Sequence, residues 1–197
     1  MLPAGELGVA LTEVNPVTVR GPFFRTVAFK YLQVVGRGGA NILSGVPGRD
    51  RGGRYNPAGG FLTTYLAESA ETALNEGVRP FLTSGVASAL ARPLVLLSVE
   101  GHLEHVLDLL DPSVRARVAT DEAELTAPYL LDALKSETAT QRLGRIAYES
   151  ARFEALRGPS VQRAGGHTIA VFPERVASPS KLEVFDPDRL LRDRLPR

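Results

Sequence analysis

Residues 52–77 read GGRYNPAGGFLTTYLAESAETALNEG and carry the clearest succession of structural signals in the chain. It opens with two glycines beside Arg54. The apolar, aromatic and β-branched residues at 61–67 then predict a strand whose successive side chains point to opposite faces. Ser69 is a typical helix N-cap, and Gly77 is a natural place for that helix to end. The stretch therefore predicts a loop, a strand and a helix in direct succession.

The remaining segments mix strand and helix patterns. Residues 92–101 have the clearest pattern of a buried strand, and residues 102–119 suggest an interrupted helix. Helical spacing extends over residues 127–156. Residues 167–173 and 181–187 read as two more strands, and the short loop between them predicts that they are neighbours in one sheet. Because strands and helices do not alternate strictly, we expect an α+β fold, a single domain with a central mixed or antiparallel sheet flanked by helices, with alternating α/β as the second choice.

The two ends and one long internal segment lack a regular pattern. Residues 1–22 contain three prolines and are predicted to be an irregular N-terminal arm, so the domain proper is expected at 23–197. Residues 23–35 favour a strand with a short turn. Residues 36–60 read as one long glycine-rich loop that carries several arginines. Residues 188–197 alternate arginines and aspartates and are predicted to be a solvated tail.

Composition excludes several classes of function. The chain has 197 residues, a formal net charge of +1 and no cysteine, which rules out thiolate zinc sites, cysteine nucleophiles and disulfides. His102 and His105 could share a metal ion, but no third ligand is evident, so we predict no metal site. Neither direct nucleic-acid binding nor membrane association is indicated, and the chain start does not resemble a signal peptide. We therefore expect a cytoplasmic protein.

Four short segments occur in a distinctive order: GGRYNPAGG, TTYLAES, ETALNE and, much later, ARFEALRGPSVQ. In this order and spacing they resemble the RES domain family, which is named for an arginine, a glutamate and a serine. Two departures are visible, a tyrosine at position 55 where tryptophan or phenylalanine is commoner, and one additional residue before Tyr65. The resemblance implies the following catalytic residues: Arg54, Tyr65, Glu76 and Ser160. It implies substrate-binding roles for three more residues: Arg25, Gly52 and Gly53.

The resemblance also implies a function. Members of the family are often toxins of bacterial toxin–antitoxin pairs, are similar in fold to ADP-ribosyltransferases and consume NAD+. We expect NAD+ as a substrate, inorganic phosphate as a possible co-substrate, no prosthetic group, and an Xre-type helix-turn-helix antitoxin as partner. Phosphorolysis or hydrolysis of the nicotinamide–ribose bond is the first expectation. The alternatives are ADP-ribosyl transfer to a protein and a catalytically silent binding module. The oligomeric state stays open, and a homo-oligomer is possible.

The residue types suit this chemistry, because cleavage of a nicotinamide–ribose bond passes through an oxocarbenium-like state. Arg54 could hold phosphate oxygens, with backbone amides of the adjacent glycines helping. Tyr65 could stack on nicotinamide, Glu76 could stabilise positive charge on the ribose, and the Ser160 hydroxyl could bind phosphate. Each of these four residues could instead have a purely structural place. The arginine could be solvated in a loop and the tyrosine could lie in the core. The glutamate could be exposed on a helix and the serine could belong to a turn.

Overall fold

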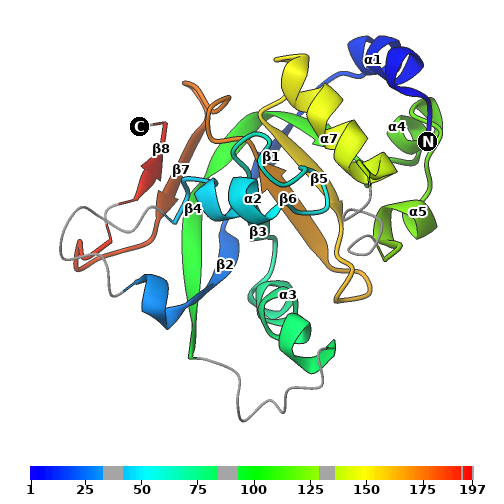
Figure 1. Cartoon of the computed structure of the whole chain (residues 1–197). Coiled ribbons are helices and arrows are strands. Elements are labelled where there is room, and N and C mark those ends of the chain that lie inside the picture. The colour runs from blue at the N-terminus through cyan, green and yellow to red at the C-terminus, as the bar shows by residue number, and fades with distance from the viewer. Residues whose placement is uncertain (33–41, 84–92, 129–135, 192, 197) are drawn as a thin grey trace.

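A 15-residue strand, β4 (Leu94–Asp108), runs through the middle of the computed structural model (Figure 1). The structure describes residues 1–32, 42–83, 93–128, 136–191 and 193–196. The other strands are β1 (Val17–Arg20), β2 (Phe23–Ala28), β3 (Thr64–Ala67), β5 (Ala155–Pro159), β6 (His167–Val171), β7 (Lys181–Val184) and β8 (Arg194–Leu195). The helices are α1 (Ala4–Thr12), α2 (Val46–Arg51), α3 (Ala70–Thr83), α4 (Pro112–Arg117), α5 (Glu122–Thr126) and α7 (Ala139–Glu149), with a 3-10 turn, η1, at Phe29–Tyr31.

All eight strands join one mixed sheet in the order β2-β3-β6-β5-β4-β7-β8, with β1 paired to β4. The β4–β5 pair is parallel, and the other pairings are antiparallel. Because β2 also pairs with β4, the strands from β2 to β4 form a closed circuit. The expected α+β fold, one domain with a central mixed sheet, is confirmed.

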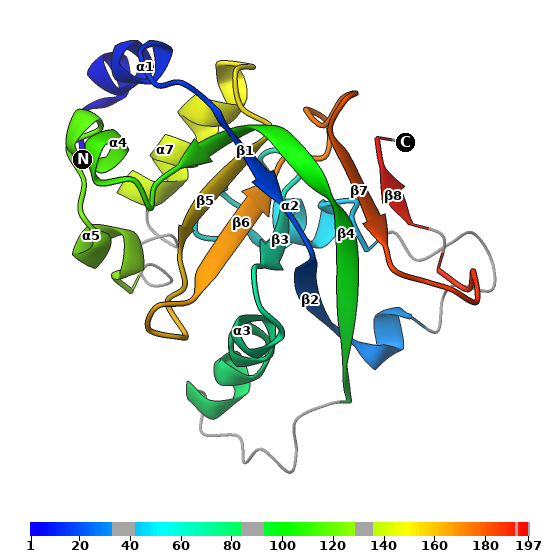
Figure 2. The ribbon, with the colours of Figure 1, turned by 180° about the vertical axis from the view of Figure 1, so that it is seen from behind.

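Two hydrophobic clusters form the core, one on each face of the sheet. Successive residues of β5, Ala155 and Leu156, belong to different clusters, as expected when side chains alternate along a strand. Helix α7 packs on the Leu156 face, and its N-terminus carries a capping box in which Thr138 and Gln141 bond each other's backbone. Figure 2 shows α1, α4 and α5 grouped near α7, with α3 beyond the other end of the sheet.

The N-terminal segment is not irregular, as its prolines suggested. Helix α1 packs on α7, and its Leu7 and Leu11 are fully buried. Strand β1 pairs antiparallel with β4. The segment at 1–22 therefore contributes a helix, a strand and core side chains.

Several other predicted boundaries are wrong. Strand β4 continues to Asp108, so residues 102–108 are strand rather than helix, and only the second half of that segment, α4, is helical. Part of the predicted loop at 36–60 forms α2, and residues 33–41 lie outside the described part of the chain. The helical spacing at 127–156 predicts a shorter and then a longer helical piece, and the longer piece is α7, although the end of the segment belongs to β5. Residues 129–135, where the shorter piece is expected, lie outside the described part of the chain.

The last two predicted strands exist but are not neighbours. Strand β6 pairs with β3 and β5, whereas β7 pairs with β4 and β8. The tail is not fully solvated either. Asp193 is 5% exposed, and its Oδ2 accepts a hydrogen bond of 2.7 Å from the backbone N–H of Leu43. Among the described helices, none is both long and apolar enough to cross a membrane.

Candidate active site

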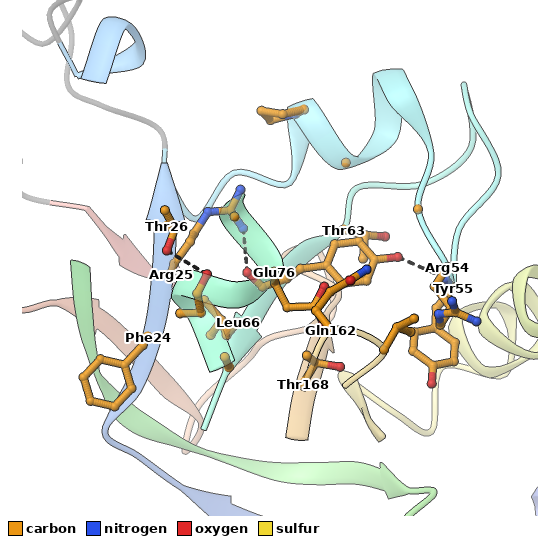
Figure 3. A pocket seen from close by; sticks show the side chains of 18 of the residues that line it. Phe24, Arg25, Thr26, Arg54, Tyr55, Thr63, Leu66, Glu76, Gln162 and Thr168 are labelled. Atoms are coloured by element: carbon orange, nitrogen blue, oxygen red, sulfur yellow. Dashed lines mark hydrogen bonds between the residues drawn. The ribbon is translucent and has the colours of Figure 1, made fainter. Parts of the chain in front are cut away.

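A pocket lies where β2 and β3 separate. These two strands pair only at Phe24 and Ala67, and beyond that point the Arg25 side chain reaches across, its Nη1 donating to the Tyr65 carbonyl at 2.9 Å. The resulting cavity has a volume of about 490 Å³, within the rough range of 300–1,000 Å³ found for small-molecule sites. Its walls come from β2, α2, the loop at 53–55, β3, α3 and the turn after β5 (Figure 3).

Arg54 enters this cavity from a tight turn. The turn is closed by a bridge between Gly53 and Asn56, in which the Gly53 N–H donates to the Asn56 carbonyl at 2.8 Å. Arg54 is 8% exposed, and its Nη1 donates to the carbonyls of Leu125 at 2.8 Å and Ala127 at 3.0 Å. The guanidinium is thus fastened to the end of α5 while its residue lines the cavity.

Tyr65 fixes this turn from β3. Its hydroxyl accepts a bond of 3.0 Å from the Tyr55 N–H and donates one of 2.7 Å to Asn56 Oδ1. Asn56, fully buried, donates from Nδ2 to the Gly48 carbonyl at 2.8 Å. Because the hydroxyl is used in this network, the ring is the part of Tyr65 best placed to meet a ligand.

Glu76 and Ser160 lie together although 84 residues separate them in sequence. The Ser160 hydroxyl donates to Glu76 Oε1 at 2.6 Å and accepts bonds from the backbone N–H groups of Gln162 and Arg163 at 3.1 and 3.2 Å. A hydroxyl has one donor and two acceptor positions, so these bonds use its whole capacity. Ser160 therefore orients the Glu76 carboxylate instead of offering a hydroxyl to phosphate, and only Glu76 of the two lines the cavity.

Among the described residues, the charged ones in the cavity wall are two cations and one anion: Arg25, Arg54 and Glu76. Burial lowers the pKa of Arg25 to about 10, an effect opposed by the nearby Asp193 carboxylate, so Arg25 stays a cation at neutral pH. Burial raises the pKa of Tyr55 to about 12, opposed by the charge of Arg54, so this phenol stays neutral. The site suits a ligand with more negative than positive charge.

The predicted glycines behave differently from each other. Gly53 lines the cavity, but its N–H is used within the turn, so the expected role of this amide in holding an anion is wrong for the observed conformation. A side chain at Gly53 would collide with the Tyr65 ring, which explains why glycine stands there. Gly52 is not among the lining residues, and its φ of 72° is a conformation that favours glycine.

Two residues that hold the turn at Arg54 were not predicted from the sequence. Gln141 Nε2 donates to the carbonyls of Gly53 at 3.0 Å and Asn56 at 3.3 Å, so α7 also holds the turn. The spacing of Thr138 and Gln141 is a recognisable capping box, but nothing in it indicates a contact 88 residues away. Asn56 lies inside the quoted motif without a predicted role. In the described part of the chain, no group of three potential metal ligands comes together.

The fold and the pocket define a single-domain α+β protein with a net cationic cavity and a carboxylate anchored at its wall. The sequence model of the RES domain matches residues 23–192, so the chain belongs to the RES domain family. A solved structure that is similar to this one is the M. tuberculosis MbcT-MbcA toxin-antitoxin complex, with a TM-score of 0.67 and 22% sequence identity, covering 92% of this chain and 90% of the other. No curated protein sequence matches the chain.

Proposed function

We propose that this protein cleaves the nicotinamide–ribose bond of NAD+ and is the toxin of a toxin–antitoxin pair. One observation carries the proposal: Arg54, Tyr65 and Glu76 line a single cavity, and Ser160 holds the Glu76 carboxylate in it. The family membership gives the expected substrate. The cavity supplies the cations, the aromatic ring and the carboxylate that this substrate requires.

Each group has a task in this reaction. Arg25 and Arg54 balance the pyrophosphate charge, and the Tyr65 ring supports the flat nicotinamide. Glu76 stabilises the positive charge that grows on the ribose as the bond to the nicotinamide nitrogen breaks. The electron pair of that bond leaves with nicotinamide, which departs as a neutral molecule.

An oxygen nucleophile then bonds to the same ribose carbon. Phosphate is our first choice, because a net cationic cavity favours a second anion, and its attack yields ADP-ribose 1″-phosphate. Water, losing a proton to solvent, would give ADP-ribose. An acceptor side chain of another protein would give an ADP-ribosylated product.

The test is nicotinamide release from NAD+ by the purified protein, with and without phosphate, using NAD+ labelled in its adenylate half. Phosphorolysis predicts release that depends on phosphate, with the label in ADP-ribose 1″-phosphate. Release that ignores phosphate would indicate hydrolysis, and label on a protein would indicate ADP-ribosyl transfer. If no nicotinamide is released in either condition, the proposal is wrong.

Three variants tie the activity to the site. Glu76→Gln removes the charge and is expected to lower kcat about 10²–10³-fold, the range seen when one group that stabilises a transition state is lost. Ser160→Ala removes one orienting hydrogen bond and should cost about tenfold. Glu71→Gln is the matched control on the same helix, because its exposed carboxylate pairs with Arg163 and should not affect turnover. Circular dichroism checks that each variant is folded.

The partner belongs to the same proposal. The similar structure, 22% identical, is titled as a toxin–antitoxin complex, which supports an antitoxin, expected to be of the Xre helix-turn-helix type, as the partner here. Expression of the wild type should arrest growth, co-expression of the antitoxin should relieve the arrest, and Glu76→Gln should be harmless.

A catalytically silent binding module is the second candidate. It is favoured by the Arg54 Nη1 group, which two backbone carbonyls already engage. For such a module, wild type and Glu76→Gln would be equally harmless to growth.

A further inference from the structure

Buried polar atoms without hydrogen-bond partners gather at the cavity. In the described part of the chain, the buried side-chain atoms that lack a partner are Arg25 Nε, Tyr55 OH, Thr63 Oγ1, Gln162 Oε1 and Arg175 Nε. All but the last belong to residues that line the cavity. An unpaired buried polar group is destabilising, so such a concentration at one place calls for a ligand that supplies the missing partners.

Thr63 and Gln162 are the two members of this set whose side chains are neither charged nor aromatic. Thr63 is 1% exposed and directly precedes β3, where its backbone N–H donates to the Gly45 carbonyl at 3.3 Å. Gln162 lies in the turn after β5, and its own backbone N–H donates to the Ser160 hydroxyl that holds Glu76. Figure 3 shows both side chains at the cavity wall with Glu76.

Together these atoms define what they can bind. The Thr63 hydroxyl can donate one hydrogen bond, and Gln162 Oε1 can only accept. A group that satisfies both carries an acceptor and an N–H donor side by side, as a primary carboxamide does. With the Gln162 side-chain amide in this orientation, a carboxylate, which has no donor, would leave Oε1 unpaired beside a negative charge.

We propose that Thr63 and Gln162 form a carboxamide-recognising subsite that selects the nicotinamide end of NAD+, an inference that rests on the proposed function. The connection through Ser160 places Gln162 close to Glu76, the carboxylate assigned to the adjoining ribose, and Thr63 lines the same cavity. The carboxamide carbonyl accepts from Thr63, and its N–H₂ donates to Gln162. Nicotinic acid, with a carboxylate at the same ring position, is rejected.

The experiment compares turnover of three dinucleotides: NAD+, its nicotinic acid analogue and its hypoxanthine analogue. The wild type is expected to prefer NAD+ over the nicotinic acid analogue in kcat/KM by tenfold or more, and to use the hypoxanthine analogue like NAD+. Thr63→Val and Gln162→Met should each reduce that preference about tenfold, the effect of one hydrogen bond. Thr63→Ser keeps the hydroxyl and should keep the preference.

A neighbouring threonine supplies the control for folding. Thr64 is fully buried, points to the other face of β3, and donates from Oγ1 to the Leu43 carbonyl at 3.0 Å. Thr64→Val should lower the urea midpoint and leave the dinucleotide preference unchanged. Thr63→Val should not lower the midpoint, because its hydroxyl has no partner to lose.

The outcomes separate the two proposals. Turnover of NAD+ by the wild type with unchanged preference in Thr63→Val and Gln162→Met overturns the subsite and leaves the function standing. If the wild type instead discriminates against the hypoxanthine analogue and the two variants lose only that discrimination, the pair reads adenine, which also overturns the subsite. If no dinucleotide is consumed, the function fails, and NMR titration with nicotinamide and nicotinic acid decides the subsite: equal binding of both overturns it.

Discussion

At the scale of single residues, the glutamate of the site depends on a serine. Ser160 donates to Glu76 and is itself fixed by two backbone N–H groups, so a hydroxyl on the turn after β5 holds the carboxylate of α3. A preorganised charge stabilises a transition state without reorganising during the reaction. In the proposed reaction Ser160 is a positioning residue, which acts through the direction that it gives to the Glu76 carboxylate.

A second carboxylate, Glu68, should make stability depend on pH. It accepts two hydrogen bonds from Arg157, of 2.6 and 2.9 Å, and lies 3.0 Å from His167 Nδ1. Burial raises its pKa, but the hydrogen bonds and charges of Arg157 and His167 outweigh this effect and lower the pKa below its usual 4.5. The resulting stability is present above the unfolded-state pKa and is lost as the pH falls through the folded-state value.

Glu68→Gln should therefore lower the free energy of unfolding at neutral pH, and the difference from wild type should shrink at about pH 3. Urea denaturation at both pH values measures it. A gap of constant size at both pH values would contradict the prediction. Glu71→Gln, which breaks an exposed pair, should change stability by less than about 1 kcal/mol.

The sequence allowed part of this site to be predicted. Arg54, Tyr65 and Glu76 could be named because their motifs are contiguous and resemble a family. Gln141 could not be found in this way, since its contact with the Arg54 turn depends on how α7 packs and has no local pattern. The hydrogen bond from Ser160 to Glu76 could not be predicted for a similar reason, because partners 84 residues apart become visible only in three dimensions.

At the scale of elements, Gly77 gives α3 its close approach to β2. We predicted that this glycine would end the helix, yet the helix continues to Thr83. A β-carbon at position 77 would lie 2.7 Å from Thr26 Cγ2, so only glycine lets the helix lie against the strand. Gly77→Ala should lower the free energy of unfolding by about 1–3 kcal/mol, the usual cost of overpacking, despite the better helix propensity of alanine.

Gly8→Ala in α1 is the matched control for this prediction. A β-carbon there would meet Ile146 Cγ2 at an ordinary 3.9 Å, so alanine should stabilise the protein by up to about 1 kcal/mol. Thermal or urea unfolding compares the two variants. Stabilisation by both substitutions would mean that the contact with Thr26 is not restrictive.

The second half of β4 shows why a strand was mistaken for a helix. A step of two residues in β1, from Val17 to Val19, lies opposite a step of three in β4, from Leu103 to Val106, so β4 carries an extra residue there. Leu103 and Val106 consequently face the same core cluster at a spacing of three. That spacing imitates helical periodicity. The bulge is held by Glu154, whose Oε1 accepts from two successive β4 N–H groups.

At the scale of the whole molecule, the first 22 residues are bound to the rest through the core. Leu11→Ala should lower the free energy of unfolding by about 2–5 kcal/mol, because the side chain is fully buried against α7 and its neighbours. Urea denaturation of the full chain measures this. A loss below about 0.5 kcal/mol, typical of a surface position, would support a detached arm before residue 23 instead.

The 84-residue separation of Glu76 and Ser160 has a consequence for the protein during its synthesis. A ribosome adding about 5–20 residues per second needs roughly 4–17 s to travel from one codon to the other. Throughout that interval the nascent chain carries the carboxylate without the hydroxyl that aims it. Whatever this pair does is thereby withheld from the growing polypeptide until the segment that carries Ser160 has been made.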